Sequence, residues 1–501
     1  MSIDPRTPCL IGAAQRTVRP EEGPSPEPLV LWHDVTRLAA EDARPGGGSK
    51  VLDAVDSLQI VYCMSWPYDD PVDRLADALG IDPRHRLYSG IGGTTPQVLV
   101  QDAGLAILNG DHDLAVITGA EALETVRQAK KAGERVAWSH RAKPAPPFPF
   151  EAPFHPAEVA HEVFQAWLTF PVFDIARRAR LGIDPATYAK QIGELLAPFS
   201  EVAATNPYAW FPTALSADHL ATPTASNRIV GYPYTKQAVS VMDVDMAATV
   251  IIASHAKADE LGVPVERRAY LHGWCYATDP VYLAEHTDLS TSPAMAAASR
   301  EALTCAGIDI DDVDHLDLYS CFASSVHLAC DALGLDPHDP RGLTVTGGLP
   351  FSGGAGSNYM LHSIATMLGV LRADPGSMGM VTGVGMHMTK HVFGLYSTAA
   401  PPQGRVRPPD SAAMQARLDA TPPATIVDEH VGHATVASCT VAHARGGEPE
   451  WGLVVTDVAD GARAYGRVED RDLLTAMESD EWVGRGVHLD PRGDGVNIVR
   501  A

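Results

Sequence analysis

An internal repeat constrains the fold of this 501-residue chain more than any other feature of its sequence. Residues 54–65 (AVDSLQIVYCMS) match residues 312–323 (DVDHLDLYSCFA) without a gap, at an offset of 258 positions. Two further matches follow in the same order, at offsets of 263 and 264, and they pair residues 89–94 with 352–357 and residues 114–120 with 378–384. Because three ordered matches at nearly one offset are hard to obtain by chance, we predict a duplication.

Each copy has the pattern helix, strand, Gly-rich turn, helix, strand. Ala-rich stretches at 35–43 and 296–306 precede the first match, and β-prone apolar runs follow them. Strands that alternate with helices predict an α/β protein with mostly parallel sheets covered by helices. The two halves should pack about a pseudo-twofold axis, with a site where their Gly-rich turns converge.

Three further segments complete the predicted organisation. An insertion at about 124–238, with Pro-rich turns and helical patterns, predicts a helical lid over the site. The composition of residues 399–409 predicts a linker. Beyond it, a small β-barrel is predicted from one short helical pattern at 470–477 and strand-like runs at 434–443, 450–458, 463–468, 486–490 and 496–499. The predicted domains are 1–275 with the lid, 276–398 and 410–501.

Charge and composition exclude several classes of function. The formal charge is -24, from 62 acidic and 38 basic residues, so the surface repels phosphate backbones and nucleic-acid binding is not expected. No apolar run is long enough to span a membrane, and the N-terminus lacks a signal-peptide pattern, so we expect a cytoplasmic protein. The seven cysteines are scattered without CxxC spacing, which predicts reduced thiols and no metal site.

Several phrases carry a family resemblance. They are AILNG at 106–110, TGAE at 118–121, GYPYTK at 231–236 and DVDMAA at 243–248. Together with the repeat and the lid, they resemble the thiolase superfamily over residues 8–398, and the similarity is greatest to the sterol-carrier-protein group and its thiolase-like relatives. The resemblance implies a duplicated, layered αβαβα fold. The last 80 or so residues resemble the OB-like barrel that accompanies such proteins.

The resemblance also implies four catalytic loops, and all four depart from the thiolase pattern. The nucleophilic cysteine, whose thiolate a helix N-terminus would stabilise, corresponds to Gly93. The adjacent Thr94 and Thr95 are expected to cap the helix instead. The Asn-Glu-Ala-Phe loop (His-Asp-Cys-Phe in the sterol-carrier group) corresponds to Tyr-Ser-Cys-Phe at 319–322. The loops at 353–355 and 383–385 lack the usual histidine and acid/base cysteine. An acetyl-CoA acetyltransferase scaffold without standard thiolase turnover is expected.

Our first hypothesis is a protein that binds coenzyme A or acyl-CoA. The phosphates of this ligand need cations or helix N-termini. The resemblance implies Lys236, Gly353, Gly354 and Gly385 as ligand-binding residues. The cluster of Arg177, Arg178 and Arg180 is an alternative source of cations, although such a cluster is more often an ordinary solvated helix face.

A second hypothesis is a retro-aldol carbon–carbon lyase on lipid- or sterol-derived 3-hydroxyacyl-CoA. Some thiolase-like relatives have a tyrosine at the first position of the Asn/His loop, as Tyr319 does here. His362, with Tyr359 on the same helical face, could reach the same pocket, and tyrosine and histidine are competent acids and bases. The structural alternatives are a tyrosine that ends a buried strand and a satisfied helix histidine.

A third hypothesis is a non-enzymatic binding module that acts through the barrel. Residues 421–501 hold 14 acidic and 7 basic side chains, which argues against nucleic acid as its ligand. We expect the barrel to pack against its own thiolase-like core and to close the substrate entrance. Thiolases usually dimerise, and the extra domain could block this, so a monomer or a homodimer is expected.

Overall fold

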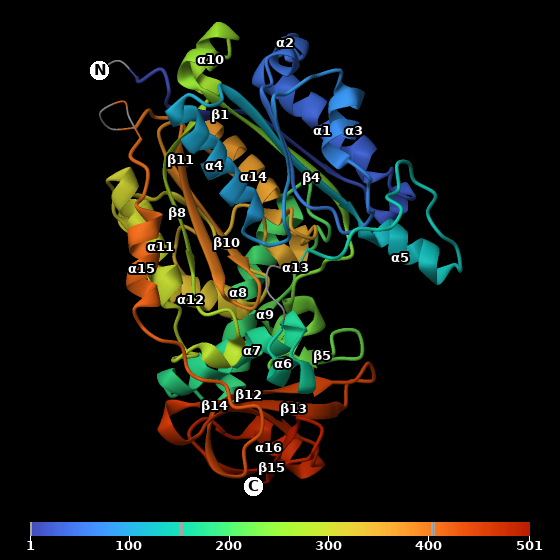
Figure 1. The fold of residues 1–501 in the computed structure, drawn as a ribbon, viewed down its shortest axis with the longest axis vertical. Coiled ribbons are helices and arrows are strands. Elements are labelled where there is room, and N and C mark those ends of the chain that lie inside the picture. Colours follow the sequence, from blue (N-terminus) through green and yellow to red (C-terminus); the bar gives the residue numbers. More distant parts are fainter. Residues whose placement is uncertain (1–2, 150–153, 402–403, 405, 501) are drawn as a thin grey trace.

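The computed structural model describes residues 3–149, 154–401, 404 and 406–500. Its core is a nine-stranded mixed sheet in the order β3-β2-β4-β7-β1-β8-β11-β10-β9, drawn in the upper part of Figure 1. The strands are β1 (Pro8–Thr17), β2 (Ser57–Ile60), β3 (His85–Tyr88), β4 (Leu114–Ala122), β7 (Asp245–Ser254), β8 (Ala269–Thr278), β9 (His315–Asp317), β10 (Met378–Gly385) and β11 (Lys390–Ser397).

The register of the sheet confirms the duplication. In the first half β2 pairs in parallel with β4, with Ser57 opposite Ala115. In the second half β9 pairs in parallel with β10, with His315 opposite Gly379. These pairs are related by the offsets of 258 and 264 found in the sequence. The two halves join where β1 pairs with β8 through Cys9 and Leu10.

The expectation of mostly parallel sheets was wrong. In the core, only the pairs β2–β3, β2–β4 and β9–β10 are parallel. The connections explain this. Two neighbouring strands are antiparallel when the chain leaves the first strand and enters the second at the same end of the sheet. The lid returns the chain from the end of β4 to the adjacent start of β7, and a short turn joins β10 to β11.

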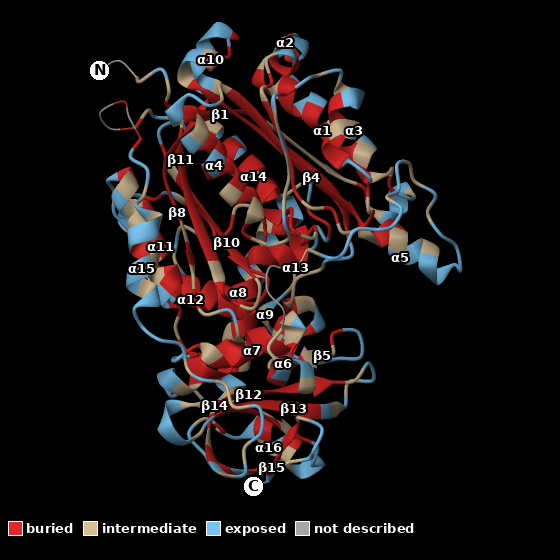
Figure 2. Ribbon diagram, viewed as in Figure 1, coloured by how far each residue is buried: buried red, intermediate tan, exposed pale blue. Residues whose placement is uncertain are grey.

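Helices cover both faces of the sheet and confirm the layered fold. The central helices α4 (Thr95–Asn109) and α14 (Tyr359–Ala373) pack against each other. The outer helices α1 (Pro28–Ala43) and α11 (Pro293–Ala306) approach β1 and β8 so closely that a Cβ at Gly12 or Gly273 would overlap a helix carbonyl. Figure 2 shows the core strands and the central helices as largely buried.

Shorter helices complete the thiolase-like core. They are α2 (Gly48–Asp53), α3 (Pro71–Leu79), α10 (His255–Glu260), α12 (Ala323–Leu333), α13 (Leu349–Ser352) and α15 (Ser411–Asp419). α15 packs on α11 and β8, so this segment belongs with the core although it follows the predicted linker. Residues 402, 403 and 405 of that linker lie outside the described residues. The predicted domain boundary at 275 falls inside β8.

Most of the predicted helical lid lies between the core and the C-terminal barrel, whereas its first helix, at 123–131, lies at the side of the core (Figure 1). Its elements are α5 (Leu123–Lys131), α6 (Pro156–Ala160), α7 (Ala166–Leu181), α8 (Pro185–Thr205), α9 (Ala217–Ala221), β5 (Ile229–Gly231), β6 (Tyr234–Thr235) and a 3₁₀ turn at Lys236–Ala238. α8 begins directly after Asp184, whose side chain accepts the N–H of Thr187 and caps the helix.

The predicted β-barrel is confirmed as a closed, five-stranded barrel with one helix after its third strand. Its elements are β12 (Gly432–His443), β13 (Pro449–Asp457), β14 (Arg463–Val468), α16 (Arg471–Ser479), β15 (Gly486–Pro491) and β16 (Asn497–Arg500). The pairing of β12 with β13 closes the barrel. Its OB-like character stays a prediction.

The barrel docks mainly on the lid. β5 continues the barrel sheet beside β12, with Gly231 opposite Ala442, and the N–H of Tyr232 donates to the Val441 carbonyl at 2.9 Å. The sequence did not predict this shared sheet, because β5 is only three residues long. In the described part of the chain, no helix has the length and apolarity needed to cross a bilayer.

Candidate functional site

The position that corresponds to the thiolase nucleophile is sterically closed. Gly93 lies just before α4, where the two halves of the core converge. A Cβ at Gly93 would lie 2.5 Å from the hydroxyl oxygen of Tyr319 and closer still to the carbonyl oxygen of Val384. Real Cβ atoms do not approach other atoms so closely, so a side chain at this position requires a shift of the backbone. Thr94 precedes α4, but its side chain makes no capping hydrogen bond, so the expected cap is absent.

Tyr319 itself is the residue that fills this space. It follows β9 and is 6% exposed, its N–H donates to the Thr382 hydroxyl at 2.8 Å, and its ring lies edge-on to Tyr359 at 5.5 Å. Burial raises the pKa of Tyr319 well above its ordinary value. The described residues offer its hydroxyl no hydrogen-bond partner. The structure therefore brings the predicted Tyr319 to the convergence of the halves as a neutral, unbonded phenol.

Cys321, in the same loop, is not an activated thiol. Burial raises the pKa of this thiol to about 12, and its Sγ lies 3.7 Å from the Ser325 hydroxyl. Because a thiol must ionise to attack a thioester, Cys321 does not replace the missing nucleophile.

His362 is placed elsewhere. Its Nδ1 lies 2.9 Å from Oε1 of Gln15 on β1, and burial lowers its pKa to about 3. Tyr359 instead bonds to Thr346 at 2.6 Å. Residues three apart on a helix differ by about 60° around its axis, which is enough here for the two side chains to face different partners. No contact joins His362 to Tyr319 in the described residues.

The three predicted ligand glycines pack against the protein. A Cβ at Gly353 would lie 2.8 Å from the sulfur of Met246, and one at Gly354 would overlap the Ser240 hydroxyl. Gly385 faces Thr94, whose hydroxyl would lie 3.4 Å from a Cβ there. Gly353 and Gly354 therefore allow neighbouring side chains to pack closely on the backbone, whereas Gly385 makes no contact of that closeness.

Lys236 lines an open pocket of about 640 Å³ between the lid and the core. The pocket is lined by Pro20, Glu124, Arg127, Trp210, Phe211, Thr213, Leu215, Ser226, Lys236, Gln237, Val241, Asp243, Pro350 and Phe351. Lys236 is exposed and makes no ion pair within the described residues. Arg127, the other cation, is held by both carboxylate oxygens of Glu124 at 2.7 Å. Lys236 is therefore the cation available to a ligand.

The pocket wall is bonded directly to two of the four altered loops. The N–H of Ser240 donates to the Cys321 carbonyl at 2.9 Å, and the N–H of Gly354 donates to the Val241 carbonyl at 2.8 Å. Tyr319 and the three predicted glycines do not themselves line the pocket. The pocket and the closed niche at Gly93 are thus separate spaces, and residues 240–241 bond the pocket wall to the loops of Cys321 and Gly354.

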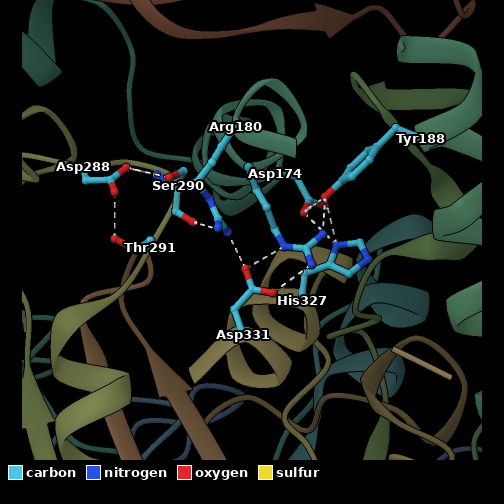
Figure 3. Close-up of polar contacts among 9 residues, drawn as sticks. Asp174, Arg180, Tyr188, Asp288, Ser290, Thr291, His327 and Asp331 are labelled. Atoms are coloured by element: carbon cyan, nitrogen blue, oxygen red, sulfur yellow. Dashed lines mark hydrogen bonds and ion pairs between the residues drawn. The ribbon is translucent and has the colours of Figure 1, made fainter. Parts of the chain in front are cut away.

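Two of the three arginines of the cluster are buried rather than solvated, and all three are paired with carboxylates. Arg177 and Arg178 are 6% and 2% exposed. Arg177 and Arg180 pair with Asp331 at 2.8 and 2.5 Å, and Arg178 pairs with Glu481 at 3.1 Å. Figure 3 shows Arg180 directed at Asp331. These charges hold the lid to the core and to the barrel, so they are poorly placed to bind phosphate.

Sequence reasoning missed a buried polar cluster around Asp174 of α7. Its members are Asp174, Tyr188, Tyr234 and His327, with exposures of 0–2%. They lie on four different elements of the lid and core, so no local spacing in the sequence predicts that they meet. The described residues contain no group of three or more His, Cys, Asp or Glu side chains that could hold a metal ion.

The duplicated, layered fold and the C-terminal barrel together define a thiolase-like protein with an additional C-terminal domain. Residues 413–494 match the thiolase-like protein type 1 additional C-terminal domain. The structure of a monomeric SCP2-thiolase like protein type 1 from Mycobacterium smegmatis is 33% identical, with a TM-score of 0.86, over 99% of this chain and 100% of that one. The chain belongs to the SCP2-thiolase-like protein type 1 family.

Two more distant similarities concern parts of the chain. Acetyl-CoA acetyltransferase 1 of Arabidopsis thaliana is 32% identical over 140 residues, which span 28% of this chain and 30% of that protein. The Ltp2-ChsH2(DUF35) aldolase structure is 16% identical over 79% of this chain and 98% of that one, with a TM-score of 0.57. At this identity the second similarity shows the fold alone.

Proposed function

We propose that this protein binds coenzyme A or an acyl-CoA without forming an acyl-enzyme. The observation that carries the proposal is the open pocket at Lys236, whose wall is hydrogen-bonded to the loops of Cys321 and Gly354. A thioester ligand in this pocket has its binding groups beside the former catalytic loops. Gly93 and Tyr319 supply neither a nucleophile nor room for one.

The chemistry of the pocket suits such a ligand. Lys236 supplies a cation for phosphate, and Trp210, Phe211 and Phe351 supply the apolar and aromatic walls typical of cofactor sites. The name of the partly matching Arabidopsis protein indicates acetyl-CoA as its substrate, which supports the same ligand class here.

Calorimetry with coenzyme A and acetyl-CoA tests the proposal. We expect Lys236→Ala to weaken binding about tenfold, or about 1.4 kcal/mol. The matched control is Lys190→Ala, which removes an exposed lysine from α8 of the same lid outside the pocket and should leave the affinity unchanged. Equal affinities in the two variants, or no binding to the parent protein, overturn the proposal.

A carbon–carbon lyase is the second candidate, and one observation favours it. The Tyr319 hydroxyl lies at the convergence of the halves and has no hydrogen-bond partner among the described residues, which leaves it free to exchange a proton with a substrate in a retro-aldol step. If the lyase hypothesis holds, Tyr319→Phe abolishes product formation from 3-hydroxyacyl-CoA and leaves ligand affinity nearly intact. Equal turnover in both proteins rejects it. His362 has no part in this proposal.

For the assembly, we propose a monomer in which the barrel holds the lid. The related Mycobacterium smegmatis structure is described as monomeric, and here the barrel is joined to the lid through β5 and the pair of Arg178 with Glu481. Sedimentation at micromolar concentration should give a single species of one chain, and a dimer contradicts this assignment.

A further inference from the structure

Asp174, on α7 of the lid, accepts three buried hydrogen bonds, two from the lid tyrosines Tyr188 and Tyr234 and one from His327 on the core helix α12. Its Oδ1 accepts from the Tyr188 hydroxyl at 2.7 Å and from Nδ1 of His327 at 2.8 Å, and Figure 3 shows these side chains converging. Its Oδ2 accepts from the Tyr234 hydroxyl at 2.5 Å. Burial acts to raise the pKa of Asp174, but His327 and the hydroxyl donors outweigh it and lower the pKa. The carboxylate is therefore ionised, and both of its oxygens accept hydrogen bonds.

Tyr234 connects Asp174 to the segment that follows Tyr319, because its hydroxyl also contacts α12. Its hydroxyl oxygen accepts the N–H of Ser324, in the first turn of α12, at 3.1 Å. The Phe322 ring stacks on Phe170 of the lid at 4.6 Å and lies 5.4 Å from the Tyr234 ring. Because α12 follows Phe322 directly, the position of its first turn determines where Tyr319 lies.

The same lid segment also forms the wall of the ligand pocket. Lys236 follows Tyr234 by two residues, and four residues later the N–H of Ser240 donates to the Cys321 carbonyl at 2.9 Å. Residues 234–240 thus contact the Tyr319 loop at both ends, and Lys236 projects between these two contacts.

We infer that Asp174 is a positioning residue: through Tyr234 it fixes the Tyr319 loop, and it links the occupancy of the Lys236 pocket to that loop. The second half of this inference rests on the proposed binding of acyl-CoA. The first half depends only on the contacts of Asp174, Tyr234 and Ser324.

The reactivity of Cys321 reports on the loop, because a buried thiol is alkylated only when its surroundings open locally. We would measure N-ethylmaleimide labelling of Cys321 by peptide mass spectrometry in the full chain, with and without acetyl-CoA. The variants Tyr234→Phe and Tyr188→Phe each delete one hydroxyl from the same carboxylate. Tyr188 contacts α12 only through His327, one turn further along, at 3.2 Å, whereas Tyr234 accepts the N–H of Ser324 in the first turn of α12. Cys439, buried in β12, reports on global unfolding.

Without ligand, Cys321 should be labelled about fivefold faster in Tyr234→Phe than in Tyr188→Phe, with Cys439 unchanged. Acetyl-CoA should protect Cys321 in the parent protein and in Tyr188→Phe, and should protect it at least about threefold less in Tyr234→Phe. Equal Cys321 rates in the two variants, or a parallel rise at Cys439, overturn the positioning role.

Undiminished protection in Tyr234→Phe overturns the link to the pocket. If calorimetry shows that acetyl-CoA does not bind the parent protein, the proposed function fails, and the comparison without ligand still decides the positioning role.

Discussion

The hydroxyl of Tyr319 lies 2.5 Å from the point at which a side chain on Gly93 would begin. The two residues come from opposite halves of the duplicated core, and together with the Val384 carbonyl they leave no space at the head of α4. The position that the family resemblance aligns with the thiolase nucleophile is therefore closed to a side chain.

Gly93→Ala should destabilise the protein by about 2–4 kcal/mol, because the methyl group must displace backbone as well as the tyrosine ring. Urea unfolding measures this cost. The matched control is Gly369→Ala in the exposed middle of α14, where nothing lies within 4 Å of the added methyl. That change should raise stability by about 0.5–1 kcal/mol, and similar effects of the two substitutions would refute the steric argument.

Glu121 should make stability fall as pH rises toward neutrality. Burial raises the pKa of Glu121 from an ordinary 4.5 to about 7. The N–H groups of Met64 and Ser65, which donate to the carboxylate at 2.7 and 2.9 Å, act in the opposite direction but are outweighed. Between pH 4.5 and 7 the folded state holds a proton on Glu121 that the unfolded state has lost. The free energy of unfolding therefore decreases as pH rises through this range, and the full loss of stability is reached above pH 7. Its size is on the order of 3 kcal/mol.

Urea unfolding from pH 4.5 to 8 checks the Glu121 prediction. Glu121→Gln keeps an acceptor for one N–H and cannot ionise, so its stability should fall less across the window. Glu134→Gln, at an exposed position, should keep the slope of the parent protein. A Glu121→Gln slope equal to that of the parent would show that Glu121 does not titrate there.

Arg178→Met should loosen the barrel from the lid. Arg178 is 2% exposed and pairs with Glu481 of the barrel at 3.1 Å, so its loss should cost about 1–3 kcal/mol. Arg180→Met, two residues away, removes a cation whose side chain is 40% exposed and should cost about 0.5 kcal/mol or less. Urea unfolding combined with limited proteolysis of the barrel tests the pair, and equal costs contradict the docking role of Arg178.

The sequence predicted the fold well because the fold is repeated. The register of β2 with β4 recurs in β9 with β10 at the offsets found in the sequence. The strand-like runs of the barrel are distinct enough in the sequence for the strand boundaries to be predicted. Strand direction was missed, because the path of the lid, rather than any strand pattern, decides that β7 runs against β4.

The site was less predictable, since its contacts join residues distant in the chain. The sequence showed that position 93 has no side chain, but it did not show that the Tyr319 ring fills the space beside it. The helical spacing of Tyr359 and His362 suggested a shared pocket, whereas Gln15 holds His362 at 2.9 Å on another side of α14. The Asp174 cluster was not predicted, because its four members are far apart in the chain and no pattern in the sequence pairs them.

Intact-protein mass spectrometry after incubation with saturating acetyl-CoA tests the central claim most directly. A protein whose nucleophile position is closed by Tyr319 and Val384 should keep its unmodified mass after acid quenching. A covalently bound acetyl group on a residue at the convergence of the two halves would contradict the account.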